Sequence, residues 1–308
     1  LQLLRQLARR KDFPLYGGMF ASFSGENLRE TLNYFDDPLK QVEKTQEKAR
    51  ILTLLAYSQR TLGNYERAKS FHQEALEIAR ESSDKPCEIA NLNHLSRIYI
   101  YEKNYDEAIS YSQRALVFSR QVGDKLGEAN GLINVGYSEV FRARQIEQME
   151  PEIYESAINY LEQGLTLAEK LGEYQSQALA YNSLGIAYVV LSKPAAAITA
   201  LEKGNQAVLN SGDRYLQGLN FAYLAEAYYT LENLVTSVYY GCLGMYLLAQ
   251  INSTEWRQAA GLMMIIKGKI QAEEFQKLLE QNRSQIIKII GVDGYDELPK
   301  LLEKYQEK

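Results

Sequence analysis

The chain has 308 residues, of which 46% are hydrophobic, and a formal net charge of -5. This acidic balance argues against nucleic acid as a partner, because binding to phosphates requires a basic face. The apolar stretches, such as residues 259–266, are too short to cross a bilayer, so we expect no insertion into a membrane. The two cysteines, Cys87 and Cys242, lie far apart without metal-ligand spacing, and we expect two reduced thiols in a cytoplasmic protein.

Residues 1–48 lack the regular pattern of the rest of the chain, and we expect an N-terminal loop with capping helices there. The segment "SGENLRETLNYF", residues 24–35, predicts a helix that Ser24 caps. "DDP" at 36–38 is expected to end this helix and to start another one, with Pro38 in its first turn. The preceding "DFPLYGGMFASFSG" predicts an irregular loop. Since the chain begins at Leu1 rather than at a methionine, the sequence leaves open whether another segment precedes it.

From residue 49 onward the chain repeats itself about every forty residues. Residues 64–88, "NYERAKSFHQEALEIARESSDKPCE", and residues 104–128, "NYDEAISYSQRALVFSRQVGDKLGE", are identical at eleven of twenty-five positions. Each copy holds two stretches with apolar residues at helical spacing, separated by a short polar turn. The five copies span residues 49–88, 89–128, 129–177, 178–217 and 218–250.

Glycine and aspartate recur at the junctions between copies, as in "VGDK" at 122–125 and "SGDR" at 211–214. Glycine can end one helix in the left-handed conformation, and aspartate can cap the start of the next. The third copy has nine additional residues within "FRARQIEQMEPE" at 141–152. They predict either a longer first helix or a protruding loop before Pro151, which begins the next helix.

Small residues recur at three fixed positions of each copy. The eighth position holds Ala56, Ser96, Gly136, Gly185 and Ala225, the twentieth holds Ala68, Ala108, Ala157, Ala197 and Ser237, and the twenty-seventh holds Ala75, Ala115, Gly164, Gly204 and Gly244. Two helices approach closely only where neither presents a bulky side chain. We therefore expect position eight to face position twenty, and position twenty-seven to face the first helix of the next copy.

Residues 251–308 depart from the repeat and predict C-terminal capping helices. Two amphipathic helices are expected in "TEWRQAAGLMMIIKGKI" and "AEEFQKLLEQNRSQIIKIIG", then a turn in "VDGY" at 292–295 and a short final helix. The end copies of an array have no neighbour, so atypical helices must cover their apolar faces.

The small residues, together with an L-G/A-x-x-Y pattern, resemble the tetratricopeptide repeat in its 40-residue form, as in kinesin light chains, Pins-type polarity adaptors and bacterial Rap-type regulators. The resemblance covers roughly residues 49–250 and departs from the family at Gln59 and Glu139, where other copies have tyrosine. It implies an all-α, right-handed superhelical solenoid of antiparallel helix pairs. The C-terminal tail also loosely resembles repeat proteins common in cyanobacteria.

The sequence offers little for catalysis. His72 and His94 are the only histidines and stand on different copies, and no HExxH, GxSxG, zinc-spaced cysteine set or Walker motif occurs. We therefore expect no enzymatic activity, no cofactor and no metal ion. A helical enzyme is the alternative that a deep pocket with converging carboxylates would favour.

The resemblance implies that the first helices line a concave wall. The candidate partner-binding residues there are Arg50, Tyr57, Arg60, Asn93, His94, Arg97, Tyr101, Asn130, Asn134, Tyr137, Asn182, Tyr223, Glu226 and Tyr229. Asparagine can hold an extended backbone because it donates and accepts, tyrosine offers flat apolar area with a hydroxyl, and arginine grips carboxylates. The alternative is that these are ordinary solvated helix residues.

We predict a non-catalytic scaffold that binds a peptide or protein segment in the concave groove. Because its arginines lie in the first two copies, we expect the partner to carry an acidic segment there. One alternative is a Rap-like regulatory sensor whose superhelix responds to a signalling peptide. Such relatives carry an N-terminal output domain, for which residues 1–48 are too short. Another is a structural assembly factor, a homo-oligomer that self-associates through its terminal helices.

Overall fold

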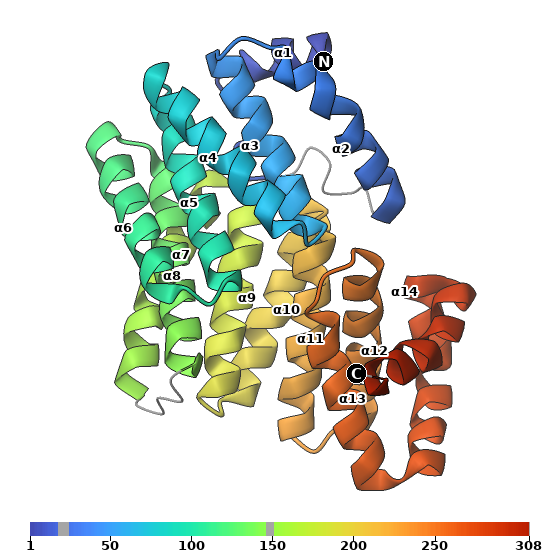
Figure 1. Ribbon diagram of the computed structural model, residues 1–308. Coiled ribbons are helices and arrows are strands. Elements are labelled where there is room, and N and C mark those ends of the chain that lie inside the picture. The colour runs from blue at the N-terminus through green and yellow to red at the C-terminus, as the bar shows by residue number, and fades with distance from the viewer. Residues whose placement is uncertain (18–24, 146–150, 308) are drawn as a thin grey trace.

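The computed structural model describes residues 1–17, 25–145 and 151–307, and within these ranges the regular structure is entirely helical (Figure 1). The helices are α1 (Gln2–Ala8), α2 (Gly25–Lys40), α3 (Gln46–Thr61), α4 (Tyr65–Glu81), α5 (Lys85–Tyr101), α6 (Tyr105–Val122), α7 (Lys125–Gln145), α8 (Pro151–Leu171), α9 (Tyr174–Val190), α10 (Pro194–Ser211), α11 (Arg214–Thr230), α12 (Leu234–Gln250), α13 (Trp256–Ile270) and α14 (Ala272–Gln306). None of them is long and apolar enough to cross a membrane, as far as the described residues go.

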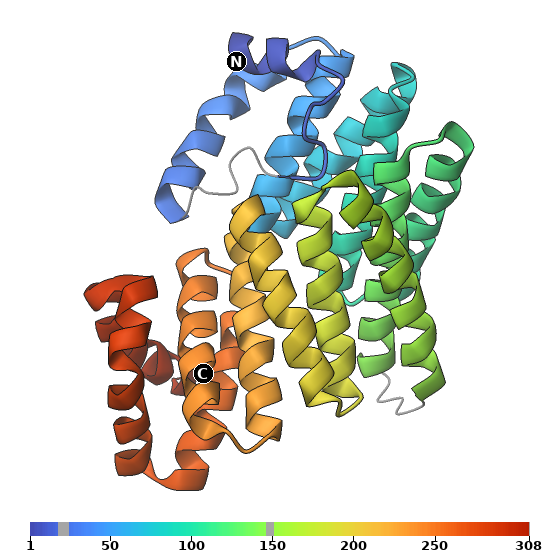
Figure 2. The same cartoon turned by 180° about the vertical axis from the view of Figure 1, so that it is seen from behind.

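The helices stack in chain order as an all-α solenoid, as the sequence predicted. Each odd-numbered helix from α3 to α11 packs on its even-numbered partner and on the next odd-numbered helix, so the odd-numbered helices form one row. The row curls, and the first copy comes to lie beside the beginnings of α9 and α11 (Figure 2). The curl leaves a hollow that the odd-numbered helices enclose.

The junctions between copies follow the predicted chemistry. Gly123 and Gly212 adopt positive φ angles of 74° and 71° at the ends of α6 and α10. Asp124 and Asp213 then cap the next helices, since their carboxylates accept from the backbone nitrogens of Gly127 and Leu216, both at 2.9 Å. Because a helix begins directly after its cap, each first helix starts a few residues before the copy boundary read from the sequence.

The close approach between positions eight and twenty is confirmed. Ser96 Oγ donates to the carbonyl oxygen of Ala108 at 2.7 Å. A Cβ atom added at Gly136 would lie 2.6 Å from the carbonyl oxygen of Ala157. The backbones of the two helices of a copy are therefore in contact where position eight faces position twenty. The angle between the two helices cannot widen without breaking this contact.

The expectation for position twenty-seven is only partly right. A Cβ atom at Gly244 would lie 2.7 Å from the backbone nitrogen of Ala222, which belongs to the first helix of the same copy. Gly204, in contrast, does face the next copy, with Asn220 Nδ2 3.0 Å from the added atom. The second helix of a copy also packs closely on its own first helix at position twenty-seven, as Gly244 does on Ala222. A small residue at this position therefore serves both contacts.

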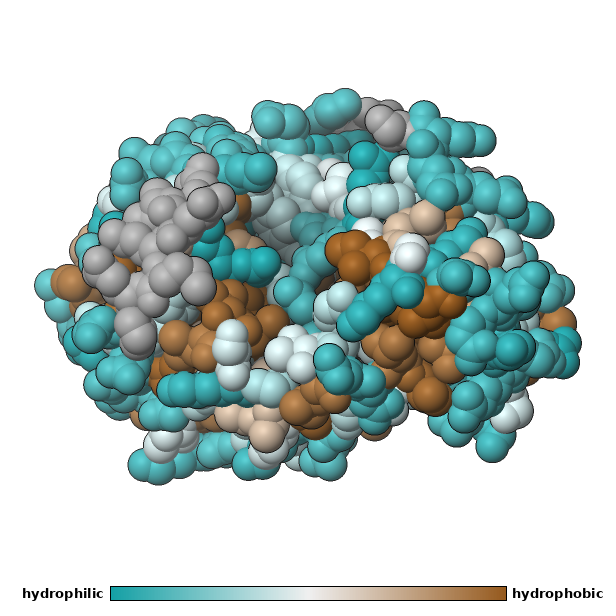
Figure 3. All heavy atoms as spheres, turned by 90° about the horizontal axis from the view of Figure 1, so that it is seen from below, coloured by the Kyte–Doolittle hydropathy of each residue, from teal (hydrophilic) through white to brown (hydrophobic). Residues whose placement is uncertain are grey.

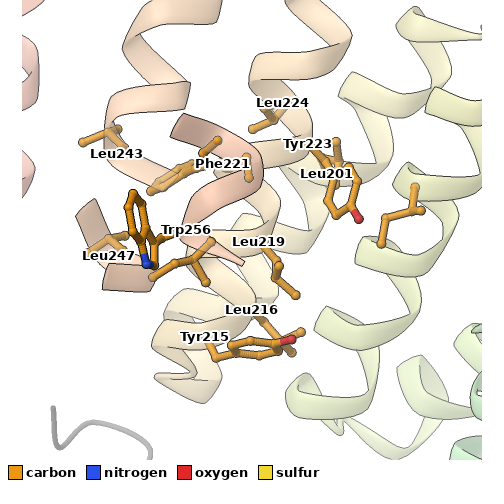
Figure 4. Close-up of a cluster of buried hydrophobic side chains, with 14 of the residues drawn as sticks. Leu201, Tyr215, Leu216, Leu219, Phe221, Tyr223, Leu224, Leu243, Leu247 and Trp256 are labelled. Atoms are coloured by element: carbon orange, nitrogen blue, oxygen red, sulfur yellow. The ribbon is translucent and has the colours of Figure 1, made fainter. Parts of the chain in front are cut away.

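The N-terminal helices cover the first copy. Leu4 of α1 and Leu32 and Leu39 of α2 form one apolar cluster with Ile51 and Leu55 of α3. At the other end, a larger cluster extends from α5 into α14, and Figure 4 shows its part around α11 and Trp256. Both ends of the array are thus covered by helices outside the repeat.

Two local predictions are wrong. Helix α2 does not end at 36–38, and no second helix begins there, since α2 runs through Pro38 to Lys40. Proline has no backbone N–H, so the helix lacks one hydrogen bond near its end and stops two residues later. The break in the last helix falls at Gly291, with a φ of 76°, and the predicted turn at 292–295 is helical. The cap Ser24 and residues 146–150 of the insertion lie outside the described residues.

Substituting Gly136 by alanine should lower the free energy of unfolding by about 1–3 kcal/mol, because the added methyl group meets backbone atoms that cannot rotate away. The matched control is Gly268→Ala in α13, where an added Cβ meets nothing within 4 Å. This control should be neutral or stabilising by about 0.5–1 kcal/mol. Thermal unfolding of both variants checks this, and equal melting temperatures would contradict the close approach.

Candidate functional site

Five of the predicted groove residues, Arg60, Arg97, Tyr101, Tyr137 and Tyr223, line cavities of the hollow, but most of the predicted set is not open to solvent. All except Tyr101, Glu226 and Tyr229 are buried. The reason is that the hollow is narrow, so that side chains from opposite walls meet inside it. Part of it is also occupied by the chain itself.

The segment after α1 lies against the inner wall of the first copies. The carbonyl oxygen of Leu15 lies 2.7 Å from His94 Nε2, and Asn93 Nδ2 donates to the Tyr16 hydroxyl at 3.2 Å. The side chains of Phe13 and Tyr16 are buried. The chain therefore supplies its own extended segment to the asparagine and histidine of this wall, which the sequence pattern did not indicate.

Arg50 is fully engaged within the chain. Its Nε donates to Asp84 Oδ2 at 2.6 Å, and its Nη1 donates to the carbonyl oxygens of Ala8 and Arg10, both at 2.9 Å. The ion pair is buried on both sides. Arg50 thus holds the N-terminal segment on the first copy.

The asparagines of the second and third copies bind one another and Arg97. Arg97 donates from Nε to Asn134 Oδ1 and from Nη2 to Asn130 Oδ1, both at 2.8 Å. Asn134 Nδ2 donates to Asn93 Oδ1 at 2.9 Å, and Asn130 Nδ2 donates to Ser176 Oγ at 3.0 Å. This row therefore links α5, α7 and α9 by buried hydrogen bonds.

The last members of the predicted set lie toward the C-terminal copies. Asn182 Nδ2 donates to Asn220 Oδ1 at 3.0 Å. Glu226 Oε2 accepts from Gln258 Nε2 at 3.2 Å, and the ring of half-buried Tyr229 lies 5.5 Å from a lysine of α13. These contacts connect α9, α11 and α13 in the same way.

A polar contact closes the curl between the first copy and the last two. The Asp213 carboxylate, besides capping α11, accepts hydrogen bonds from the Tyr57 hydroxyl and from Gln175 Nε2. Tyr57 and Asp213 are 156 positions apart in the sequence. Burial raises the pKa of Tyr57 well above its usual value, so the hydroxyl keeps its proton and donates it to the carboxylate.

The two histidines, which stand on different copies, meet inside the hollow. The rings of His72 and His94 are stacked with their centroids 4.8 Å apart, and both are completely buried. His72 Nδ1 lies 2.8 Å from Asn91 Oδ1. Burial lowers the pKa of His72 to about 3 and that of His94 well below its usual range, so both rings are neutral.

An aromatic cavity of about 240 Å³ lies where α5 ends, α7 passes and α11 begins. Its aromatic lining consists of Tyr101, Tyr105, Tyr137, Phe141, Tyr215 and Tyr223. Seen from below, the molecule is hollowed near its centre, with hydrophobic side chains gathered on either side (Figure 3). The lining also includes Ile100, Lys103, Leu219, Thr254, Glu255 and Gln258.

A second, much smaller space adjoins the aromatic cavity. This arginine cavity has a volume of about 10 Å³ and is lined by Arg60 and Arg97, and it shares Tyr101, Tyr137 and Tyr215 with the aromatic cavity. The shared tyrosines place the two arginines next to the aromatic cavity.

The arrangement offers binding groups rather than reacting groups. Among the residues that the structure describes, no three of His, Cys, Asp and Glu gather closely enough to hold a metal ion. Cys87 and Cys242 are free and buried, and burial raises the pKa of each thiol to about 12. A protonated thiol is a poor nucleophile, so neither cysteine is activated.

Comparison with protein families agrees with this geometry. Residues 47–121 match the model of the tetratricopeptide repeat. The matched segment is therefore similar to tetratricopeptide repeats. The same helix-pair packing continues through α12, beyond the matched residues. Tetratricopeptide repeats generally form non-catalytic scaffolds for protein interactions. No match to the chain was found among curated proteins.

Several solved structures are similar to the chain. A Rap protein in complex with Competence and Sporulation Factor is 15% identical, with a TM-score of 0.56 over 99% of this chain and 78% of that chain. BtubC from P. vanneervenii is 21% identical, with a TM-score of 0.47 over 75% of this chain and 89% of that one. A STAND protein with a tetratricopeptide repeat sensor from Pyrococcus horikoshii is 20% identical, with a TM-score of 0.49 over 90% and 42% of the two chains. At these identities the likeness concerns the fold alone.

Lowering the pH from 7.5 to 5 should destabilise the fold through the two buried histidines. In the unfolded chain a histidine takes up a proton near pH 6.5, whereas the lowered pKa values keep both rings neutral in the fold. The unfolded state therefore binds more protons as the pH falls below 6.5. Each histidine should cost about 2 kcal/mol of unfolding free energy by pH 5, which urea unfolding at the two pH values measures.

The variant His72→Gln isolates this effect, because its amide can still donate to Asn91. It should lose about half of the histidine-linked pH dependence. An identical pH dependence in the wild-type protein and the variant would contradict the assignment.

Proposed function

We propose that this protein is a non-catalytic interaction scaffold that binds a segment of a partner protein in the aromatic cavity. The proposal rests on which part of the hollow is filled by the chain's own residues and which part stays open. Residues of the N-terminal segment and the asparagine row occupy the wall of the first copies, whereas the aromatic cavity keeps about 240 Å³ of space. A ligand of the concave wall therefore finds room at this place.

The lining of the cavity supports a segment with an apolar or aromatic side chain. Tyrosine rings present flat apolar surface together with a hydroxyl, and they are favoured where binding energy concentrates. Lys103 and Gln258 are exposed at the cavity and can pair with polar groups of the segment. Arg60 and Arg97 lie next to it, which supports a partner with an acidic group.

The proposal uses part of the groove predicted from the sequence. Tyr101, Tyr137 and Tyr223 become direct contacts of the partner, and Arg60 and Arg97 supply positive charge beside them. The other predicted residues act in this proposal as the support that holds the helices of the wall in place.

Panning a random peptide library on the protein, followed by titration of the recovered peptides, tests the binding site. The variant Tyr101→Ala should weaken the recovered peptides at least tenfold, about 1.4 kcal/mol, because this half-buried ring forms the wall of the cavity. The matched control is Tyr111→Ala, a half-buried tyrosine on the outer helix α6. Equal loss in both variants, or no loss in either, would reject the aromatic cavity as the site.

A second candidate is a regulatory sensor whose curl responds to a peptide. The aromatic cavity lies between α5, α7 and α11, and the contact of Tyr57 with Asp213 at the beginning of α11 closes the same curl. A peptide that pushes α11 outward would therefore strain the hydrogen bond between Tyr57 and Asp213. The likeness to the Rap protein, whose structure contains a bound factor, extends over 99% of this chain and makes the candidate worth testing.

Small-angle scattering separates the two candidates. For a sensor, a saturating recovered peptide should change the radius of gyration of the wild-type protein. For a rigid scaffold, the scattering profile should stay the same apart from the mass of the peptide. Tyr57→Phe, which removes the hydroxyl bonded to Asp213, should mimic the change only in a sensor.

A further inference from the structure

The arginine cavity contains two buried cations without a bound carboxylate. Arg97 is 4% exposed, and its recorded hydrogen bonds go to the neutral amide oxygens of Asn130 and Asn134. Arg60 is 7% exposed, and its Nε is buried without a hydrogen-bond partner. Ordinary buried arginines are paired, as Arg50 is with Asp84 in the same hollow.

The surroundings of Arg60 favour its charge without pairing it directly. Burial disfavours the charged guanidinium, but Tyr57, Tyr215 and Asp213 outweigh burial and raise the pKa of Arg60. The guanidinium carbon lies 5.0 Å from the ring centroid of Tyr57 and 5.6 Å from that of Tyr215. The Asp213 carboxylate does not line the cavity, and its hydrogen bonds come from the Tyr57 hydroxyl, Gln175 and a backbone amide rather than from Arg60. The arginine cavity therefore has two positive charges facing it and one negative charge outside it.

The two cations also repel each other. The pKa of Arg97 falls to about 10, first because of burial and then because of the charge on Arg60. Two like charges at one desolvated cavity are unfavourable unless an anion lies between them.

We propose that the arginine cavity binds a small monovalent anion between Arg60 and Arg97. The centre of a water-sized group can move within about 10 Å³ of the cavity, so there is room for one small ion or one carboxylate oxygen. The unpaired Arg60 Nε supplies a charge-assisted donor. A free halide and a carboxylate entering from the aromatic cavity share this chemistry. The free ion needs no partner protein, so the site stands even if the proposed function fails.

Thermal unfolding at equal ionic strength in sodium chloride, sodium acetate and sodium methanesulfonate tests the site, because the bulky sulfonate is neither a halide nor a carboxylate. Chloride should raise the melting temperature by about 3 °C relative to methanesulfonate, if its concentration is about ten times its Kd. A larger rise in acetate would support the site with a carboxylate as the preferred anion. Equal melting temperatures in the three salts would overturn the proposal.

The variant Arg60→Met identifies the residues responsible. It is the better choice, because Arg97 donates to two asparagines whereas no hydrogen bond is recorded for the Arg60 side chain. The variant should lose the anion-dependent rise. The control Arg120→Met, which removes an exposed arginine paired with Glu128, should keep it. An undiminished rise in Arg60→Met would overturn the proposal.

Crystals grown in sodium bromide provide a measurement that needs no variant. An anomalous peak between the guanidinium groups of Arg60 and Arg97 is expected in the wild-type protein. If bromide peaks occur only elsewhere on the surface and the salt series shows no rise, the cavity holds no anion.

Discussion

The structure depends on the close approach of two helix backbones at small residues. Where Gly136 faces Ala157, and Ser96 donates to the carbonyl of Ala108, no side chain separates the helices of a pair. Each pair is thereby a thin, rigid unit, and each unit packs on the next in nearly the same way. Repeating one small rotation from unit to unit curls the array until the first copy reaches the fifth, where Tyr57 binds Asp213.

The tightness of this curl decides what the inner wall can do. Polar residues that would line an open groove instead reach one another, as Arg97 reaches Asn130 and Asn134. Residues 13–17 also enter the hollow and use the hydrogen-bonding groups of Asn93 and His94. Space is left beside the aromatic side chains of α5, α7 and α11, and this is where a partner is proposed to bind.

Charge is distributed unevenly inside the hollow. Arg50 is paired with Asp84, and the two histidines are kept neutral by burial, so neither needs an external counter-ion. Arg60 and Arg97, next to the aromatic cavity, have no carboxylate bonded to them among the described residues. The aromatic side chains proposed to bind a partner therefore lie beside the two arginines proposed to bind an anion. A carboxylate of the partner could be that anion.

The sequence alone determined the features that depend on neighbouring residues: the helix pairs, the left-handed Gly212, the cap Asp213 and the facing of positions eight and twenty. These follow from spacing and backbone chemistry within one copy. Only the tertiary structure decided that the groove residues are buried and that Tyr16 enters the hollow. The curvature of the array is the sum of small rotations between five successive copies, and these rotations depend on packing between copies. The N-terminal segment is not part of the repeat, so the repeat pattern does not predict where it packs.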